Sequence, residues 1–324
     1  MRKEFRGIYA PYIKQFITFK RELGFKYVTE EYIYYVFDRL TIARGEAIIG
    51  ITKDLANEWT RENPNESNSY RCHKAVCLNQ LASFLCKMGI PSYITQVPAY
   101  RSTFTPHIYS KSEIAAIFNA CDDIRGKQAQ KSIIIILPAL IRLLYGTGLR
   151  ISEALSLKTK DVNLDDRYLV VRDSKNGKER MIPISDSLSE VCKEYVKYRG
   201  LLPVNPSVID YFFVSLSGRV CKKRVIGKWF EEILWKAGIP RNDQGPRIHD
   251  LRHTFSVHSL AMMAESGVDL YCSLPILSAY LGHQSIAATN GYVRLTSEMY
   301  PGLLRDADMV CLNVFPNTFE YEAN

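Results

Sequence analysis

Between residues 89 and 110 the sequence loses its helical periodicity, and this interruption constrains the fold more than any other feature. Pro91, Pro98 and Pro106 are interleaved there with Ser, Thr and Tyr residues. Proline has no amide hydrogen to donate and disrupts a helix, so the stretch is expected to be an extended linker. We therefore predict an N-terminal domain of residues 1–90, a linker of residues 91–110 and a larger domain of residues 111–324.

The size and composition of the chain fit two globular domains. Hydrophobic residues make up 47% of its 324 residues, enough for a sizeable core. The longest apolar stretches, such as Ile133–Leu140, are too short to span a bilayer, and the N-terminal residues contain no apolar signal-peptide segment. We therefore predict a cytoplasmic protein. Its formal net charge of +8 favours a polyanionic partner, with nucleic acid ahead of an anionic membrane surface.

The N-terminal domain is predicted to be a bundle of four short helices. In the first, from Tyr12 to Leu23, hydrophobic residues recur close to every 3.6 residues. A Ser or Thr side chain that can accept a hydrogen bond from a free backbone amide precedes each of the others. These three helices, each given from its N-cap, are Thr29 to Ala43, Thr52 through Trp59, and Ser67 or Ser69 to Met88.

The larger domain is predicted to be mainly helical with a small antiparallel sheet. Two β-prone runs, Tyr168–Arg172 and Glu179–Ile184, flank Asn176-Gly177, a strong hairpin-turn signal. Tyr211–Val214 is a candidate third strand. The predicted helices are one capped by Ser112 and running through Phe118, an apolar and buried one within Ser132–Leu144, and others over 222–237, 249–265, 273–281, 285–294 and about 297–310. The fold class is thus α+β.

The first candidate for chemistry is Arg150, in the segment Gly-Thr-Gly-Leu-Arg that follows a buried helix. The glycines allow a sharp turn, which places Arg150 at the start of the next helix, where free backbone amides favour an anion. An arginine there can bind a phosphate through two hydrogen bonds. A surface salt bridge with Glu153 is an equally good interpretation of this segment alone.

A second group of candidates lies in His-Asp-Leu-Arg-His. His249 and Arg252 are three residues apart and share a helix face, which suits a proton-transfer group beside a phosphate-binding group. The spacing of His249 and His253 superficially resembles a zinc-protease helix. We disfavour a metal site, because Asp250 replaces the glutamate and Arg252 would repel a cation. Two structural histidines are the more common alternative.

The third group comprises His283, at a helix start after Gly282, and Tyr292, which follows Gly291. A glycine weakens a helix by about 1 kcal/mol, which would let a segment carrying a nucleophile move. Taken alone, Tyr292 is one of 20 tyrosines, most of which must serve packing. Lys175 and Lys178 flank the hairpin turn and could reach into a groove, although a plain polar turn is the simpler interpretation.

In this order, the motifs GTGLRISEAL, HDLRHTF and LGHQSIAATNGYV resemble those of the tyrosine recombinase, or phage-type integrase, family. The resemblance covers the whole chain in outline and is sharp in the larger domain. It implies an N-terminal core-binding DNA-binding domain, a catalytic domain with a C-terminal oligomerisation helix, and a C-shaped clamp around DNA. The roles that it implies are phosphate binding by Arg150 and Arg252, general acid by Lys175, acid/base by His249, phosphate contact by His283, and nucleophile by Tyr292.

The resemblance implies site-specific recombination through a 3′-phosphotyrosyl intermediate and a Holliday junction. The ester preserves the bond energy, so neither ATP nor a metal or other cofactor is needed. The implied partners are two DNA duplexes, a homo-tetramer, and accessory DNA-bending proteins or a partner recombinase, with the protein nucleoid-associated when bound. The segment Gly267–Pro275 departs from the family's plain helix and suggests a branch carried by mobile elements.

Three alternatives to the assignments remain open. A type IB topoisomerase-like enzyme uses a similar residue set to relax supercoils. A DNA-binding protein could keep the fold and lose catalysis. Within the recombinase interpretation, Lys178 could replace Lys175 as the general acid, because the two are cross-strand neighbours on the predicted hairpin.

Overall fold

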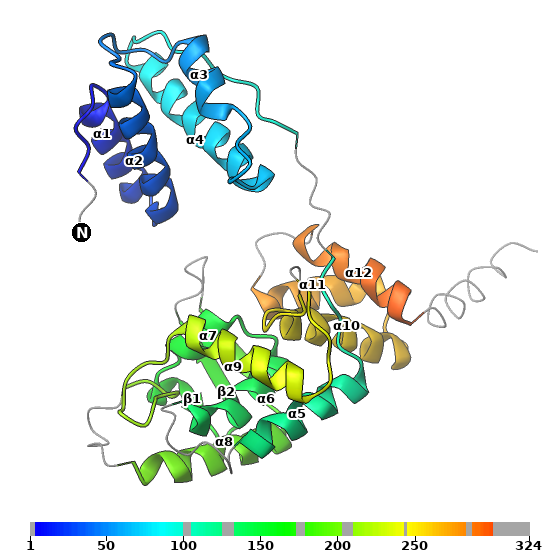
Figure 1. Ribbon diagram of the computed structural model, residues 1–324. Coiled ribbons are helices and arrows are strands. Elements are labelled where there is room, and N and C mark those ends of the chain that lie inside the picture. Colours follow the sequence, from blue (N-terminus) through cyan, green and yellow to red (C-terminus); the bar gives the residue numbers. More distant parts are fainter. Residues whose placement is uncertain are drawn as a thin grey trace, which may run out of the picture. The chain divides into compact units, whose positions relative to one another are not determined.

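The computed structural model describes residues 4–99, 105–124, 133–172, 179–202, 210–242, 245–282 and 287–300. Contacts divide the chain into two compact units, Met1–Phe104 and Thr105–Asn324. Across the described residues the elements are helices, with a single small antiparallel sheet, which confirms the predicted fold class (Figure 1). Among the helices described, none is both long enough and apolar enough to cross a bilayer.

The first unit contains the four predicted helices around one core. They are α1 (Ala10–Glu22), α2 (Val28–Ala43), α3 (Lys53–Thr60) and α4 (Asn68–Lys87). Thr52 and Ser67 cap α3 and α4 by accepting hydrogen bonds from the amides of Leu55 and Tyr70. The core is rich in aromatic rings, among them Phe16, Tyr34, Phe37 and Trp59.

The predicted cap Thr29 is wrong, because α2 begins one residue before it. Its N-cap is Tyr27, whose backbone adopts a left-handed φ of 49°. No side chain caps this helix. The hydroxyl of Tyr27 instead donates a hydrogen bond to Gln80 on α4 at 2.6 Å, which ties the start of α2 to another helix.

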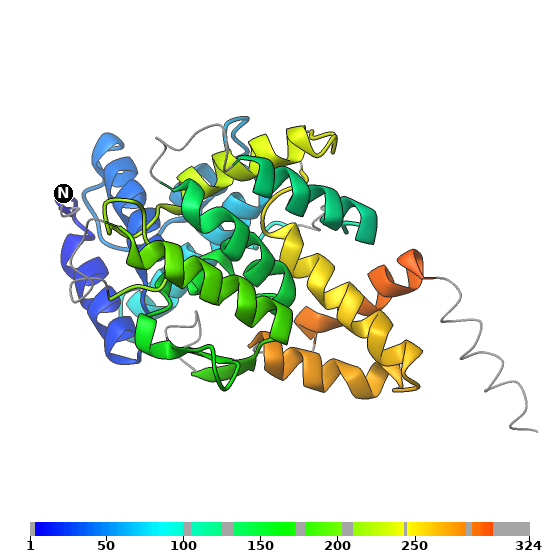
Figure 2. The same cartoon turned by 90° about the horizontal axis from the view of Figure 1, so that it is seen from below.

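The second unit is larger and is arranged around a buried helix, α6. Its helices are α5 (Lys111–Ile124), the 3-10 turn η1 (Ile134–Ile136), α6 (Leu137–Thr147), α7 (Ile151–Ser156), the 3-10 turn η2 (Thr159–Asp161), α8 (Asp186–Gly200), α9 (Lys223–Lys236), α10 (Asp250–Glu265), α11 (Leu270–Leu281) and α12 (Ala287–Met299). Helix α6 is apolar on nearly every face and packs against α5, α8 and α10. In both views α10, α11 and α12 lie together (Figures 1 and 2).

The sheet has the order β1-β2-β3, with both pairs antiparallel. Its strands are β1 (Val162–Asn163), β2 (Tyr168–Val171) and β3 (Arg180–Pro183). Leu169 on β2 lies opposite both Val162 on β1 and Ile182 on β3. The two longer strands are those predicted, and the turn Asn176-Gly177 lies outside the described residues.

Tyr211–Val214, predicted as the third strand, forms only isolated bridges, and that prediction is wrong. Tyr195 and Arg199 on α8 donate hydrogen bonds to the carbonyl of Phe212 at 3.0 and 2.9 Å. Side chains of α8 therefore bond backbone positions that a neighbouring strand would otherwise pair. Phe212 and Phe213 are both buried, whereas consecutive residues of a half-buried strand face opposite sides.

Three further helix predictions need correction. Helix α5 runs past Phe118 to Ile124. Its cap is Ser110, not Ser112, because the backbone amide of Glu113 donates a hydrogen bond to the Ser110 hydroxyl. Helix α8 was not predicted. Helix α12 continues to Met299, so no new helix begins near 297, and the rest of 297–310 after Tyr300 lies outside the described residues.

Candidate active site

Arg150 occupies the N-cap of α7, as the sequence predicts. The chain turns there because Gly148 adopts a left-handed φ of 59°, and a side chain on Gly148 would come within 2.4 Å of the Phe255 ring. The Arg150 guanidinium donates a hydrogen bond to Glu153 at 2.9 Å, and its backbone amide donates another at 3.0 Å. The glutamate is not a surface partner, since its side chain is only 2% exposed. The carboxylate therefore fixes the orientation of a half-buried arginine.

Arg252 lies on α10 and is 3% exposed. Its guanidinium donates hydrogen bonds to two backbone carbonyls, that of Gly148 at 2.7 Å and that of Leu281 at 2.8 Å. These carbonyls orient the guanidinium without neutralising its charge. Burial, together with the positive charge of Arg150, lowers the pKa of Arg252 to about 10. The two arginines thus lie close enough to repel each other, which is the arrangement expected of a site built for an anion.

Tyr292 lies on α12 in a small apolar cluster with residues of α10 and α11, and it is 6% exposed. Its hydroxyl oxygen lies 3.0 Å from Nδ1 of His253. Burial raises the pKa of Tyr292, while the charges of Arg252 and Arg150 act in the opposite direction. The phenol is therefore neutral at neutral pH, and its hydroxyl lies in the electrostatic field of both arginines.

His249 is the N-cap of α10 and remains exposed at the surface. Partial desolvation, followed by the charges of Arg252 and Arg150, lowers the pKa of His249 to about 4, so the imidazole is neutral at neutral pH. Its ring packs edge-to-face on that of His253, with centroids 4.9 Å apart. Among the residues described, no group of three or more His, Cys, Asp or Glu side chains could hold a metal ion.

The structure thus brings together four of the six predicted site residues, Arg150, His249, Arg252 and Tyr292. Lys175, its alternative Lys178, and His283 lie outside the described residues. Helix α11 ends at Leu281, and Gly282 follows with a left-handed φ of 65°, the break that the sequence predicts.

Two residues of the site were not predicted to belong to it. One is His253, which the sequence suggested only as a disfavoured metal ligand or a structural histidine, and which contacts the Tyr292 hydroxyl. The other is Arg180 on β3, whose guanidinium donates hydrogen bonds to Glu153 at 2.8 and 3.3 Å and to the carbonyl of Tyr280 at 3.0 Å. A signal for Arg180 existed, because it shares a strand face with the buried Ile182. A charged residue on an inward face usually has a specific partner.

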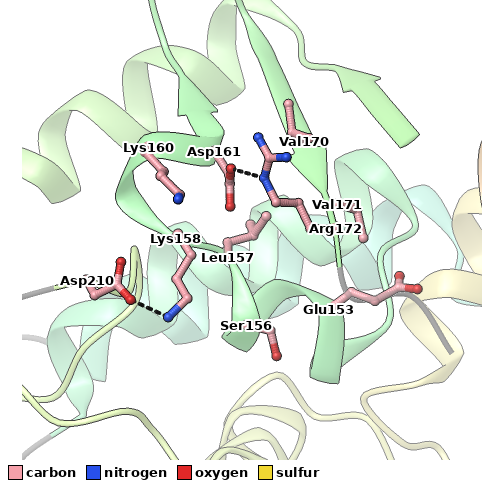
Figure 3. A pocket seen from close by; sticks show the side chains of 10 residues that line it. All are labelled: Glu153, Ser156, Leu157, Lys158, Lys160, Asp161, Val170, Val171, Arg172 and Asp210. Carbon is pink, nitrogen blue, oxygen red and sulfur yellow. Dashed lines mark hydrogen bonds and ion pairs between the residues drawn. The ribbon is translucent and has the colours of Figure 1, made fainter. Parts of the chain in front are cut away.

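Glu153 also lines a pocket of about 170 Å³ (Figure 3). The basic side chains of two of its residues are bonded to acids, Arg172 to Asp161 at 2.6 Å and Lys158 to Asp210. Asp161 is buried, so Arg172 anchors the end of β2 to η2. An arginine with an acidic partner therefore stands at the last described residue before 173–178, Arg172 directly after β2, and another at the first residue of β3, Arg180.

Comparison with known proteins identifies the family. The model of the phage integrase family matches residues 108–299, more than half of the chain. The chain belongs to the phage integrase family. The putative integrase/recombinase y4rB of Sinorhizobium fredii is 28% identical over 90% of this chain and 95% of its own length. Tyrosine recombinase XerA of Pyrococcus furiosus is 36% identical over 49% of this chain and 50% of its own.

Solved structures of integrases and recombinases share the fold. The Tn1549 transposon integrase in complex with circular intermediate DNA aligns with a TM-score of 0.63 at 18% identity, over 87% of this chain and 94% of that one. The XerH recombinase bound to palindromic difH substrate aligns with a TM-score of 0.59 at 21% identity, over 82% and 74%. The predicted family is confirmed, and with it the prediction that this enzyme is a tyrosine site-specific recombinase.

Proposed function

We propose that this recombinase cuts and rejoins duplex DNA with Tyr292 as the nucleophile and Arg150 and Arg252 as the phosphate-binding groups. The observation that carries the proposal is the position of the buried Tyr292 hydroxyl in the field of both guanidiniums. Three side chains that are remote in the sequence meet there, one from the N-cap of α7, one from α10 and one from α12.

The chemistry follows from the charges. A phosphodiester repels nucleophiles because its oxygens are anionic, and two guanidiniums offset that charge and the extra charge of the five-coordinate transition state. Attack by the phenol forms a 3′-phosphotyrosyl ester and releases a 5′ hydroxyl. The departing 5′ oxygen needs a proton. We assign that proton to Lys175, phosphate contact to His283 and further acid/base assistance to His249.

The Tyr292 hydroxyl must reach the phosphorus, yet the residue is packed in the cluster between α10, α11 and α12. We infer that α12 shifts when DNA binds. Gly291 precedes Tyr292 inside this helix, and a glycine costs about 1 kcal/mol of helix stability relative to alanine. Such a shift is therefore least costly at this position.

The proposed assembly is a homo-tetramer on two recombination sites, since exchange between two duplexes needs four strand cuts. We assign the chain to a branch carried by mobile elements, in the cytoplasm, with accessory DNA-bending proteins or a partner recombinase. Support comes from the intervening segment Gly267–Pro275 and from the names of y4rB, an integrase/recombinase, and of the Tn1549 transposon integrase. The two-unit chain also suits a clamp around DNA.

Covalent trapping tests the proposal. The protein is incubated with duplex fragments that cover the DNA flanking its gene, each with a nick just 3′ of a candidate cleavage position so that the short released strand diffuses away. The native protein should form an adduct that survives denaturation, and Tyr292→Phe should form none. Tyr280→Phe is the control, because Tyr280 is a partly buried tyrosine that packs against the cluster containing Tyr292 and stacks on Phe255.

The outcomes separate the alternatives. An adduct that depends on Tyr292, with recombinant junctions from two sites, supports the proposal. Relaxation of supercoils without junctions would favour a topoisomerase-like activity. No adduct from the native protein on any fragment that it binds would favour a DNA-binding protein without catalysis. Zinc in stoichiometric amount would favour a metal site at His249 and His253.

A further inference from the structure

The contact between His253 and Tyr292 has no counterpart among the roles assigned so far. His253 follows Arg252 on α10, and its Nδ1 lies 3.0 Å from the Tyr292 hydroxyl oxygen on α12. When the imidazole carries its proton on Nε2, Nδ1 accepts the phenolic hydrogen. The side chain is partly exposed, so a proton taken up there can later pass to solvent or return.

The nucleophile needs such an acceptor. A phenol attacks a phosphodiester efficiently only as it loses its proton, and burial keeps the pKa of Tyr292 above its ordinary value. His249 is the other histidine of the motif, but its pKa of about 4 makes it a weak base. Its imidazole packs against His253, whereas the Tyr292 hydroxyl lies within hydrogen-bond distance of His253 itself.

We propose that His253 is a catalytic residue that takes the phenolic proton of Tyr292 during cleavage and returns it during religation. The proposal deepens, and rests on, the assignment of Tyr292 as the nucleophile. In cleavage the Oη–H bond breaks and an N–H bond forms at Nδ1, while the Oη–P bond forms and the bond from phosphorus to the 5′ oxygen breaks. A separate acid, assigned to Lys175, protonates the 5′ oxygen. Religation is the reverse of each step.

The chain offers a matched control on the same helix. His258 lies five residues after His253, and its Nδ1 is 3.0 Å from the hydroxyl of Tyr145 on α6. This pair joins the same two atoms at the same distance, and both histidines are partly buried. Neither Arg150 nor Arg252 contributes to the pKa shift of His258 or of Tyr145. His258→Gln therefore reports what the loss of a histidine–tyrosine hydrogen bond does to α10 alone.

The experiment measures single-turnover cleavage of the nicked duplex that traps the native protein. His253→Ala and His253→Gln should cleave roughly 100-fold or more slowly, the range for loss of a general base. Their affinity for the duplex should stay within about threefold of native, a difference under 1 kcal/mol. His258→Gln should cleave at close to the native rate.

Two rescue measurements separate proton transfer from mere positioning. Added imidazole should accelerate His253→Ala in a saturable way and leave the native enzyme unchanged. Replacing Tyr292 by 3-fluorotyrosine, a more acidic phenol, should narrow the gap between His253→Gln and native. A structural role for His253 predicts neither effect.

The proposal is overturned if His253→Ala cleaves at the native rate. It is also overturned if folded, DNA-binding His253 variants are slow but neither rescue works, because His253 then only holds Tyr292 in place. Failure of the proposed function looks different, since the native protein itself would then form no adduct that Tyr292→Phe removes.

Discussion

Arg180 of β3 donates hydrogen bonds to both carboxylate oxygens of Glu153, which in turn orients Arg150 at the start of α7. The same guanidinium bonds the carbonyl of Tyr280, next to the Leu281 carbonyl that orients Arg252. All three of its nitrogens are thus engaged with protein atoms, and its side chain is 12% exposed. Arg180 therefore helps to position Arg150 through Glu153, and it bonds the carbonyl next to the one that orients Arg252, the two arginines that we propose bind the phosphate.

We expect Arg180→Gln to slow cleavage of the natural diester by roughly tenfold to 100-fold, because small misplacements of catalytic groups have effects of that size. A methylphosphonate at the cleaved position removes the charge that Arg150 offsets. On that substrate the deficit of the variant should shrink. Equal deficits on both substrates would mean that Arg180 does not act through phosphate binding.

The control for this prediction is Arg142→Gln. Arg142 on α6 also bonds both oxygens of a carboxylate, that of Asp122, at 2.7 and 3.0 Å, and lies outside the site. It should lose a comparable ion pair and cleave both substrates as the native enzyme does. Both variants are compared below their unfolding temperatures, measured by circular dichroism.

The sequence predicts the residue types of this site better than their partners. Arg150, Arg252 and Tyr292 stand in motifs whose local spacing can be recognised in one chain. Arg180 and His253 matter because β3 and α12 come to lie beside α7 and α10, a relationship between elements that local spacing does not encode. Their roles therefore become visible only in the folded chain.

The same distinction explains the errors in the fold. The strands β2 and β3 follow from β-branched and apolar runs around a turn signal. Helix α8 was missed although Ser185 caps it and Leu188, Cys192 and Tyr195 lie on its buried side, because its other positions are largely polar. Because α8 was not predicted, there was no reason in the sequence to expect that its Tyr195 side chain would donate a hydrogen bond to the carbonyl of Phe212. The segment around Phe212 was therefore wrongly predicted to be a strand of the sheet.

Gly148→Ala should destabilise the protein by about 2–5 kcal/mol, the sum of left-handed backbone strain and overpacking. The added methyl would lie 2.4 Å from the Phe255 ring, and the carbonyl of Gly148 accepts a hydrogen bond from Arg252. Gly238→Ala is the control. It has a similar φ of 71° with no atom within 4 Å, so only the backbone strain of about 1–2 kcal/mol applies. Urea unfolding of both variants measures the difference, and equal losses would contradict the close packing at Gly148.

His249 should titrate near pH 4 in the free protein, below its ordinary value of 6.5, because desolvation and the charges of Arg252 and Arg150 oppose its protonation. The folded-state pKa is lowered, so the stability that His249 contributes is present above pH 6.5 and is lost as the pH falls from 6.5 towards 4. His249→Gln should therefore lose less stability over that window than the native protein.

Bound DNA should raise the pKa of His249, because the phosphate offsets the positive charges around it. Proton NMR of the imidazole, assigned by its absence in His249→Gln, measures both states. A pKa near 6.5 in the free protein, or no change with DNA, would show that the arginine field does not reach this ring.

The general acid can be assigned by changing the leaving group. A 5′-bridging phosphorothiolate releases a thiolate, which departs without protonation because a thiol is far more acidic than an alcohol. We expect Lys175→Ala to cleave the natural duplex roughly 100-fold or more slowly and the phosphorothiolate at close to the native rate. Lys178→Ala should be slowed much less on the natural duplex. If Lys178→Ala alone shows the deficit that sulfur rescues, then the acid is Lys178. If neither variant is rescued, protonation of the 5′ oxygen must come from a histidine of the site, and His249 becomes the residue to test in the same way.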